Sequence, residues 1–184
     1  MNKLLSTFLL IGLAICSSTG FAQSKNLKLV FIRHAEKPEN GDNLSCQGLN
    51  RSLQLPAVLS KKFGRPSVVY VPALNLGKTT KRMRMLQTIT PFAVKYNLAI
   101  NSKYTEEDPG AMGEALLQEA GTVIIVWDHN SIQPMLKKLG LKKTGSLTWL
   151  DDDYDSMWIV SFSTGKPVLS KDSEGIKPAA GCSF

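Results

Sequence analysis

Several common kinds of site are excluded by what this sequence lacks. The chain has only two histidines in 184 residues, His34 and His129, and it has no HxH, HxxxH or CxxC pair. Zinc sites need three or four ligands, usually with some of them at such short spacings. A metal site is therefore disfavoured. The sequence also has no GxSxG segment, so a serine hydrolase of the α/β type is not supported.

Long apolar runs and basic repeats are also missing from the body of the chain. No segment after residue 22 is long and apolar enough to form a transmembrane helix. The lysines and arginines are scattered, and no repeat of aromatic and basic residues appears. Nucleic acid is therefore not an expected partner.

The first 22 residues have the organisation of a signal peptide. Lys3 supplies a positive start, residues 4–16 are apolar, and Gly20 and Ala22 are small residues of the kind that a signal peptidase reads. We expect cleavage after Ala22 and export to the periplasm or the medium. Cleavage leaves 21 lysines and arginines against 15 acidic residues, a net charge of +6. A basic protein of this kind suits anionic partners.

Two cysteines remain after this cleavage, Cys46 and Cys182. An exported protein meets an oxidising environment, which permits a disulfide. The sequence leaves two alternatives open: a bridge that ties the C-terminal segment to the body, or two free thiols.

Apolar runs alternate with amphipathic stretches from residue 27 to residue 140. Strands are expected at 27–32, 67–71, 98–100 and 123–127, and helices at 45–63, 79–96, 108–117 and 131–139, with a final strand pair at 157–162 and 168–169. Pro56 should kink or restart the first helix. This alternation predicts a single-domain α/β three-layer sandwich, with a mainly parallel sheet, helices on both faces and an antiparallel edge. The domain should span residues 23–170, and residues 171–184 should form a loose tail.

Each histidine follows an apolar strand pattern. Leu29–Ile32 leads directly into Arg33 and His34, and His129 lies two residues after the run 123–127. Ligands bind beyond the carboxyl ends of strands in open α/β sheets. The cluster at residues 81–84, which includes Arg82 and Arg84, opens a helix at the same edge. Because guanidinium groups match phosphate oxygens, these residues predict a phosphate pocket.

Four segments, taken in order, resemble motifs of the histidine phosphatase superfamily, which includes the cofactor-dependent phosphoglycerate mutases. They are Phe31–Glu36 with its Arg-His pair, Leu44–Arg51 at the start of the first helix, Arg84–Thr88 with its Arg-x-x-Gln-Thr pattern, and Val123–His129. The resemblance covers residues 27–140 and implies a phosphoglycerate mutase-like fold.

The same resemblance implies a phosphatase that needs no cofactor and acts on a small phosphorylated molecule. His34 would attack phosphorus and become phosphohistidine. Arg33, Arg84 and His129 would hold the phosphoryl oxygens and stabilise the charge of the transition state. The natural substrate and the oligomeric state cannot be read from the sequence.

The general acid departs from the family pattern. One branch of the family places an aspartate after the second histidine, but Asn130 stands there in this chain. The other branch uses a glutamate between the second arginine and the second histidine, which makes Glu106, Glu107 and Glu114 candidates. Asp128 either orients His129 or caps a loop, and Arg82 remains an alternative to Arg84. A non-catalytic protein that binds phosphate ligands is therefore the competing hypothesis.

Other polar residues are interpreted as surface features. Glu36 and Lys37 lie either at the rim of the pocket or in a solvated loop. Arg51 is expected on the surface of the first helix, and the acidic run Asp151–Asp155 is expected to form a solvated turn.

Overall fold

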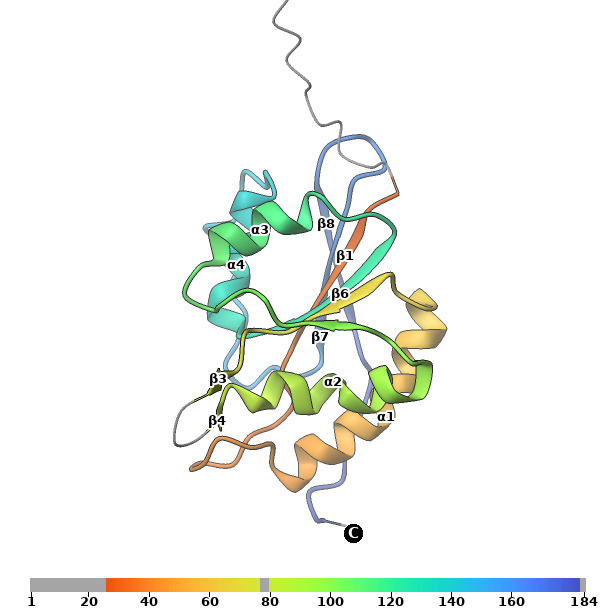
Figure 1. Ribbon diagram of the computed structural model, residues 1–184, viewed down its shortest axis with the longest axis vertical. Coiled ribbons are helices and arrows are strands. Elements are labelled where there is room, and N and C mark those ends of the chain that lie inside the picture. The colour runs from red at the N-terminus through yellow and green to blue at the C-terminus, as the bar shows by residue number, and fades with distance from the viewer. Residues whose placement is uncertain (1–25, 77–79, 183–184) are drawn as a thin grey trace, which may run out of the picture.

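One mixed sheet forms the centre of the protein (Figure 1). The computed structural model describes residues 26–76 and 80–182; the predicted signal peptide and its cleavage site lie outside them. In the described part, six strands pair in the order β5-β2-β6-β1-β7-β8. The parallel strands are β1 (Lys28–Arg33), β2 (Val68–Tyr70), β5 (Ile100–Asn101) and β6 (Thr122–Trp127). The antiparallel edge is formed by β7 (Ser156–Ser161) and β8 (Val168–Ser173), as predicted.

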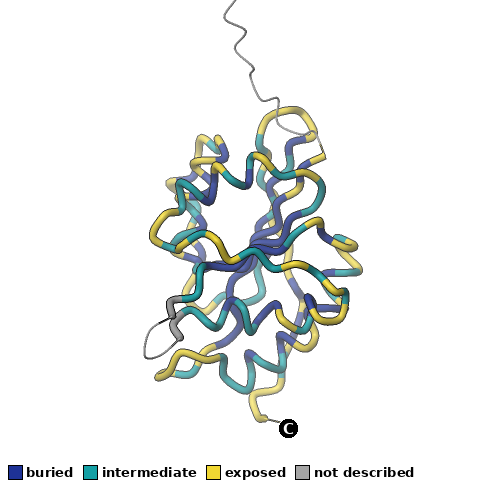
Figure 2. Tube along the Cα trace, viewed as in Figure 1, coloured by how far each residue is buried: buried dark blue, intermediate teal, exposed yellow. Residues whose placement is uncertain are grey.

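Helices cover both faces of this sheet, which confirms the predicted three-layer arrangement. Helices α1 (Cys46–Phe63) and α2 (Met83–Tyr96) lie on one face, and α3 (Pro109–Leu116) and α4 (His129–Lys138) lie on the other (Figure 1). Strand β1 sends Leu29 and Phe31 into the apolar cluster that contains residues of α3 and α4, and Val30 and Ile32 into the cluster that contains residues of α1 and α2. The central strands are accordingly buried on both sides (Figure 2).

Helix α1 begins where the sequence predicts. Ser45 is its N-cap, and the Ser45 hydroxyl accepts a hydrogen bond of 3.1 Å from the Gly48 N–H. The expected restart at Pro56 is wrong, because α1 continues as one helix to Phe63. The buried neighbours Leu55 and Leu59 hold this part of the helix on the sheet, so one missing backbone donor does not end it.

Helix α2 starts later than predicted. It begins at Met83, after Arg82 adopts a left-handed conformation with φ 65°. The sequence offers Thr79 or Thr80 as the cap of this helix; Thr79 lies outside the described residues, and Thr80 belongs to a short strand before the helix. Where a loop is predicted, the chain forms the short antiparallel pair β3 (Asn75–Leu76) and β4 (Thr80–Lys81). The left-handed Arg82 connects β4 directly to the first residue of α2.

The prediction of a loose tail is wrong for residues 171–182. Strand β8 continues to Ser173, and both Glu174 and Ile176 are buried. Cys182 forms a disulfide with Cys46, with their Cα atoms 4.8 Å apart. The segment is polar in sequence, but contacts with α1, far away along the chain, hold it in place.

None of the helices in the described part of the chain is both long enough and apolar enough to span a membrane.

Candidate active site

The two histidines follow neighbouring parallel strands. In the pairing of β1 with β6, Arg33 lies opposite Trp127. His34 and Asp128 are the next residues on the two strands, and His129 is the first residue of α4. The two histidines therefore follow strands that pair directly with each other, at the same edge of the sheet.

His34 is buried and held in one tautomer. Its Nδ1 lies 2.7 Å from the carbonyl oxygen of Ala35. A carbonyl oxygen only accepts hydrogen bonds, so Nδ1 carries the proton and Nε2 carries the free lone pair. Burial lowers the pKa of His34 to about 4, and the charges of Arg33 and Arg84 lower it further, against the opposing effect of the Ala35 hydrogen bond. His34 is therefore neutral at neutral pH.

Arg33 is buried beside His34 and is held by the loop before β7. One terminal nitrogen, Nη1, donates to the carbonyl oxygens of Leu150 (3.3 Å) and Asp151 (2.5 Å). The centre of the guanidinium lies 4.2 Å from the centre of the Tyr154 ring. The acidic run begins as the exposed turn that the sequence predicts, at Asp151 and Asp152. Its backbone and Tyr154 also pack on Arg33, which the sequence does not predict.

The Gln-Thr pair of α2 holds the segment that follows His34. Thr88 Oγ1 accepts a hydrogen bond of 2.8 Å from the Ala35 N–H. Gln87 Oε1 accepts one of 3.0 Å from the Leu44 N–H. Two side chains of one helix therefore fix both ends of the loop 35–44, which explains in physical terms why these residue types follow the arginine.

Arg84, rather than Arg82, acts on His34. Its Nε donates to the carbonyl oxygen of Asn43 over 3.2 Å, and its Nη2 donates to that of Gly41. Its positive charge is among the causes that lower the pKa of His34. Arg82 instead pairs with Glu106 and Glu107.

Glu106 has the properties of a proton donor. Burial raises its pKa to about 7, and the charges of Asp128 and Glu107 add to the effect against the opposing charge of Arg82. Arg82 Nη1 lies 2.5 Å from Glu106 Oε2, but without the geometry of a hydrogen bond. The other carboxyl oxygen, Oε1, is buried and has no partner among the described residues. Glu106 therefore carries a proton for much of the time near neutral pH.

The other two candidate acids are less suited to this role. Glu107 is exposed and pairs with Arg82, and a hydrogen bond from its own backbone lowers its pKa, with Arg82 adding to the shift. Glu114 pairs with Lys138 on the surface of α3 and α4. The Glu107 carboxyl should therefore be ionised and unable to donate a proton.

His129 contacts a carboxylate that the sequence analysis did not single out. Its Nε2 lies 2.7 Å from Asp151 Oδ1. Its Nδ1 is buried without a hydrogen-bond partner in the described part of the chain, 3.7 Å from Asp128 Oδ2. Asp128 also caps α4, since its Oδ1 accepts a hydrogen bond from the Asn130 N–H. Of the two predicted alternatives for Asp128, the structure shows the cap, whereas Asp128 Oδ2 is too far from Nδ1 for a hydrogen bond that would orient His129.

A buried ion network lies behind the His34 loop. Arg51, expected on the surface, is buried instead, and its Nε lies 3.0 Å from both carboxylate oxygens of Glu36. Its Nη1 donates to Glu174 (2.7 Å) and to Asp155 (3.3 Å). Glu36 is accordingly a buried structural residue rather than part of a solvated loop. No local pattern signals the network, because its members lie 15 to 123 residues apart from Arg51.

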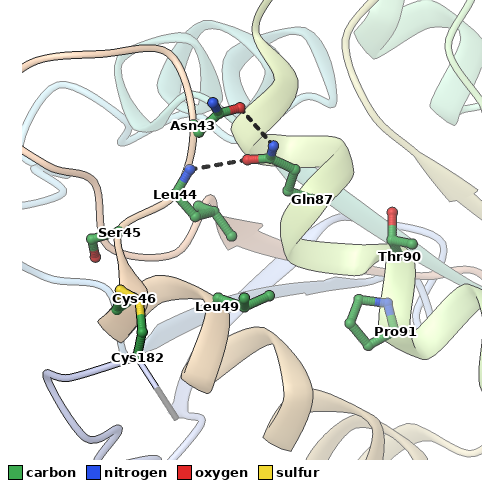
Figure 3. A pocket seen from close by; sticks show the side chains of 9 residues that line it. All are labelled: Asn43, Leu44, Ser45, Cys46, Leu49, Gln87, Thr90, Pro91 and Cys182. Atoms are coloured by element: carbon green, nitrogen blue, oxygen red, sulfur yellow. Dashed lines mark hydrogen bonds between the residues drawn. A yellow bond between two sulfur atoms is a disulfide. The ribbon is translucent and has the colours of Figure 1, made fainter. Parts of the chain in front are cut away.

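A cavity of about 500 Å³ lies away from both histidines, between α1 and α2 (Figure 3). Gln87 and Asn43 close one side of it, Leu49 and Pro91 line it, and the disulfide forms part of its wall. A smaller cavity of about 310 Å³ lies beside His129. Within residues 26–76 and 80–182, no three His, Cys, Asp or Glu side chains gather as metal ligands.

Comparisons with known proteins support the fold. No family model matches the chain, and no curated protein matches it. Several solved structures do. The protein histidine phosphatase SixA complexed with tungstate is 14% identical, with a TM-score of 0.59 over 80% of this chain and 97% of that one. Phosphoserine phosphatase from Entamoeba histolytica, in complex with 3-phosphoglyceric acid, is 14% identical, with a TM-score of 0.55 over 82% and 98%.

Phosphoglycerate mutase from Plasmodium falciparum is 12% identical, with a TM-score of 0.54 over 86% of this chain and 98% of that one. The predicted phosphoglycerate mutase-like fold is confirmed by these likenesses. Identities this low establish the fold alone.

Proposed function

We propose that this protein is an exported phosphatase that hydrolyses phosphate monoesters through a phosphohistidine on His34. The observation that carries the proposal is the state of His34: neutral, with Nδ1 bound to the Ala35 carbonyl and Nε2 left with a lone pair. A nucleophilic imidazole needs this combination. The fold that the chain shares with solved phosphatases supports the same reading.

In the first step, His34 Nε2 attacks phosphorus and forms a P–N bond. The P–O bond to the leaving group breaks, and its electron pair stays on the leaving oxygen, which takes the proton of Glu106. The guanidinium groups of Arg33 and Arg84, together with His129, hold the three remaining phosphoryl oxygens and stabilise their charge.

In the second step, water attacks the phosphorus of the phosphohistidine. Glu106, now ionised, takes a proton from that water, and the P–N bond breaks to return neutral His34 and inorganic phosphate. Glu106 suits both roles because its pKa of about 7 lies close to neutral pH. The reaction requires no metal and no other cofactor.

A second candidate function is binding of a phosphorylated ligand without turnover. Two observations favour it. Asn130 replaces the aspartate that follows the second histidine in one branch of the family. Arg33 Nη1 and two nitrogens of Arg84 donate to backbone carbonyls, which a phosphoryl group bound by these atoms would have to displace. Turnover of an alkyl phosphate, whose leaving group needs a proton, separates an enzyme from a binder; failure over a broad panel of phosphomonoesters favours the binder.

The proposed substrate is a small phosphorylated molecule outside the cytoplasm. Export rests on the signal-peptide pattern of residues 1–22. The net charge of +6 after cleavage suits an anionic substrate. Neither nucleic acid nor a membrane is required as a partner.

Quenching in alkaline detergent after mixing with a ³²P-labelled aryl phosphate, followed by treatment of separate portions with acid and alkali, tests the mechanism. The wild-type protein should retain phosphate that is labile in acid and stable in alkali, as a phosphoramidate is. His34→Gln should retain none and should lose turnover, whereas the matched variant of the other histidine, His129→Gln, should still become labelled, only more slowly. Full phosphatase activity in His34→Ala would show that the mechanism is wrong.

A further inference from the structure

The loop before β7 contacts three groups of the candidate site. The Asp151 carboxylate lies 2.7 Å from His129 Nε2, and the Asp151 carbonyl oxygen accepts from Arg33 Nη1. The Tyr154 ring lies against the guanidinium of Arg33. The centre of the Tyr154 ring is 6.0 Å from the centre of the His34 ring. The Asp151 side chain is 94% exposed, so it reaches His129 from the solvent side.

The contact between Asp151 and His129 determines which ring nitrogen of His129 remains without a partner. A hydrogen bond from His129 lowers the pKa of Asp151, so the carboxylate is ionised and only accepts, and Nε2 must carry a proton. The opposite edge, Nδ1, lies 3.7 Å from Asp128 Oδ2. Asp128 comes directly after β6 and His34 directly after β1, and the last residues of these two strands pair with each other. The negative charge of Asp128 raises the pKa of His34. The Nδ1 edge therefore lies beside Asp128, whose charge acts on His34.

We propose that Asp151 is a positioning residue that holds His129 by Nε2, so that Nδ1 faces a phosphoryl group at His34. The inference rests on the proposed function and adds a residue to it. When both ring nitrogens of His129 carry a proton, the Nε2–H bonds to Asp151, and the Nδ1–H remains available for a hydrogen bond to a phosphoryl oxygen. Nδ1 is buried and has no partner among the described residues, and a bound phosphoryl oxygen supplies the missing acceptor.

Asp128 does not replace Asp151 in this role. Its Oδ1 accepts the Asn130 N–H at the start of α4, and its Oδ2 is too far from Nδ1 for a hydrogen bond. Arg33 is held by the carbonyl of residue 151 rather than by its side chain. Substitutions of the Asp151 side chain therefore remove the contact with His129 and leave the backbone contact with Arg33 in place.

Imidazole ¹⁵N spectroscopy gives a readout that does not depend on turnover. The chain has two histidines, so the spectrum contains the signals of two imidazole rings. The spectrum of His34→Gln shows which of these signals belong to His129. In the wild-type protein, His129 should be protonated at Nε2, and inorganic phosphate should shift its Nδ1 signal. Asp151→Ala should shift the His129 tautomers toward protonation at Nδ1 and weaken the response to phosphate, with Asp151→Asn between the two because its amide oxygen still accepts.

Phosphate affinity and kinetics complete the test. Asp151→Ala should raise the Kd for inorganic phosphate and lower kcat for an aryl phosphate, each by roughly five- to tenfold, the size expected for one exposed charge-assisted hydrogen bond. Asp151→Glu should restore both to within about twofold of wild type. Asp152→Ala removes the same charge one residue away and should change neither.

Two outcomes overturn the proposal. One is a His129 spectrum and a phosphate affinity that do not change in Asp151→Ala. The other is tighter phosphate binding in that variant, which would mean that the carboxylate competes with phosphate. The proposed function fails separately: if the spectra and the Kd values behave as expected but no phosphomonoester is turned over, Asp151 positions His129 in a binding protein.

Discussion

Arg51 binds both carboxylate oxygens of Glu36 through a buried Nε, at 3.0 Å from each oxygen. Glu36 lies two residues after His34, and Arg51 also reaches Glu174 in the C-terminal segment. The Glu174 side chain is 1% exposed, and burial raises its pKa to about 8. One guanidinium therefore joins the segment after the proposed nucleophile to the end of the chain.

Arg51→Ala should unfold far more easily than the wild-type protein. Removing the guanidinium leaves Glu36 and Glu174 buried without a partner, which costs about 3–5 kcal/mol when a buried pair is broken. Urea unfolding measures this loss. The matched control is Lys62→Ala, which removes an exposed pair with Asp172 and should cost at most about 1 kcal/mol. Equal stability of the two variants would contradict the structural role of Arg51.

Gly48→Ala should also destabilise the protein, although alanine normally favours a helix. A Cβ at this position would lie 2.2 Å from the carbonyl oxygen of Glu36, so α1 or the loop after His34 must move. Overpacking of this kind costs about 1–3 kcal/mol. Gly110→Ala in α3, where the nearest atom would be 3.4 Å away, should instead be neutral or stabilising by up to about 1 kcal/mol. Thermal unfolding of both variants measures the two changes in stability.

The pH profile of kcat/KM should be bell-shaped with limbs near pH 4 and pH 7. His34 must be neutral to attack, so activity rises as pH increases through its pKa of about 4. Glu106 must be protonated to serve as acid, so activity with an alkyl phosphate falls as pH increases through about 7. An acid limb near the ordinary histidine pKa of 6.5 would show that His34 is not held neutral in the way the structure indicates.

Glu106→Gln should separate substrates by their leaving groups. Turnover of an alkyl phosphate should fall by about 10²–10⁴-fold, the usual contribution of a general acid. Formation of phosphohistidine from an aryl phosphate should change little, because that leaving group needs no proton, and the alkaline limb should disappear. Glu107→Gln removes the adjacent exposed carboxylate and should leave both substrates unaffected. A similar loss on both substrates in Glu106→Gln would point to a role in binding instead.

Reduction of the disulfide should lower stability and release the C-terminal segment from α1. The bridge between Cys46 and Cys182 spans 136 residues, and constraining a loop of that length stabilises a fold by about 2–5 kcal/mol. Urea unfolding with and without a reductant measures the effect. In the double variant Cys46→Ser and Cys182→Ser, the reductant should change nothing; a reductant-insensitive wild type would show that the bridge adds no stability.

Features that depend on neighbouring residues were predictable. The run 123–127 reads as a strand because it is apolar throughout, and Ser45 reads as a helix cap because it precedes an amphipathic stretch. The position of His34 and His129 after strands followed from the same local patterns. Pro56 was misread because packing of α1 on the sheet, which no short window shows, outweighs one missing hydrogen bond.

The alternation of strands and helices, and the places of both histidines directly after strands, could be predicted from the residues alone, because periodicity and strand direction are local properties of the chain. Four features came from the fold instead: Arg51 is buried against Glu36, the Asp151 carboxylate contacts His129, burial raises the pKa of Glu106, and Cys46 is bonded to Cys182. These depend on burial and on contacts between distant segments, which no spacing in the sequence encodes.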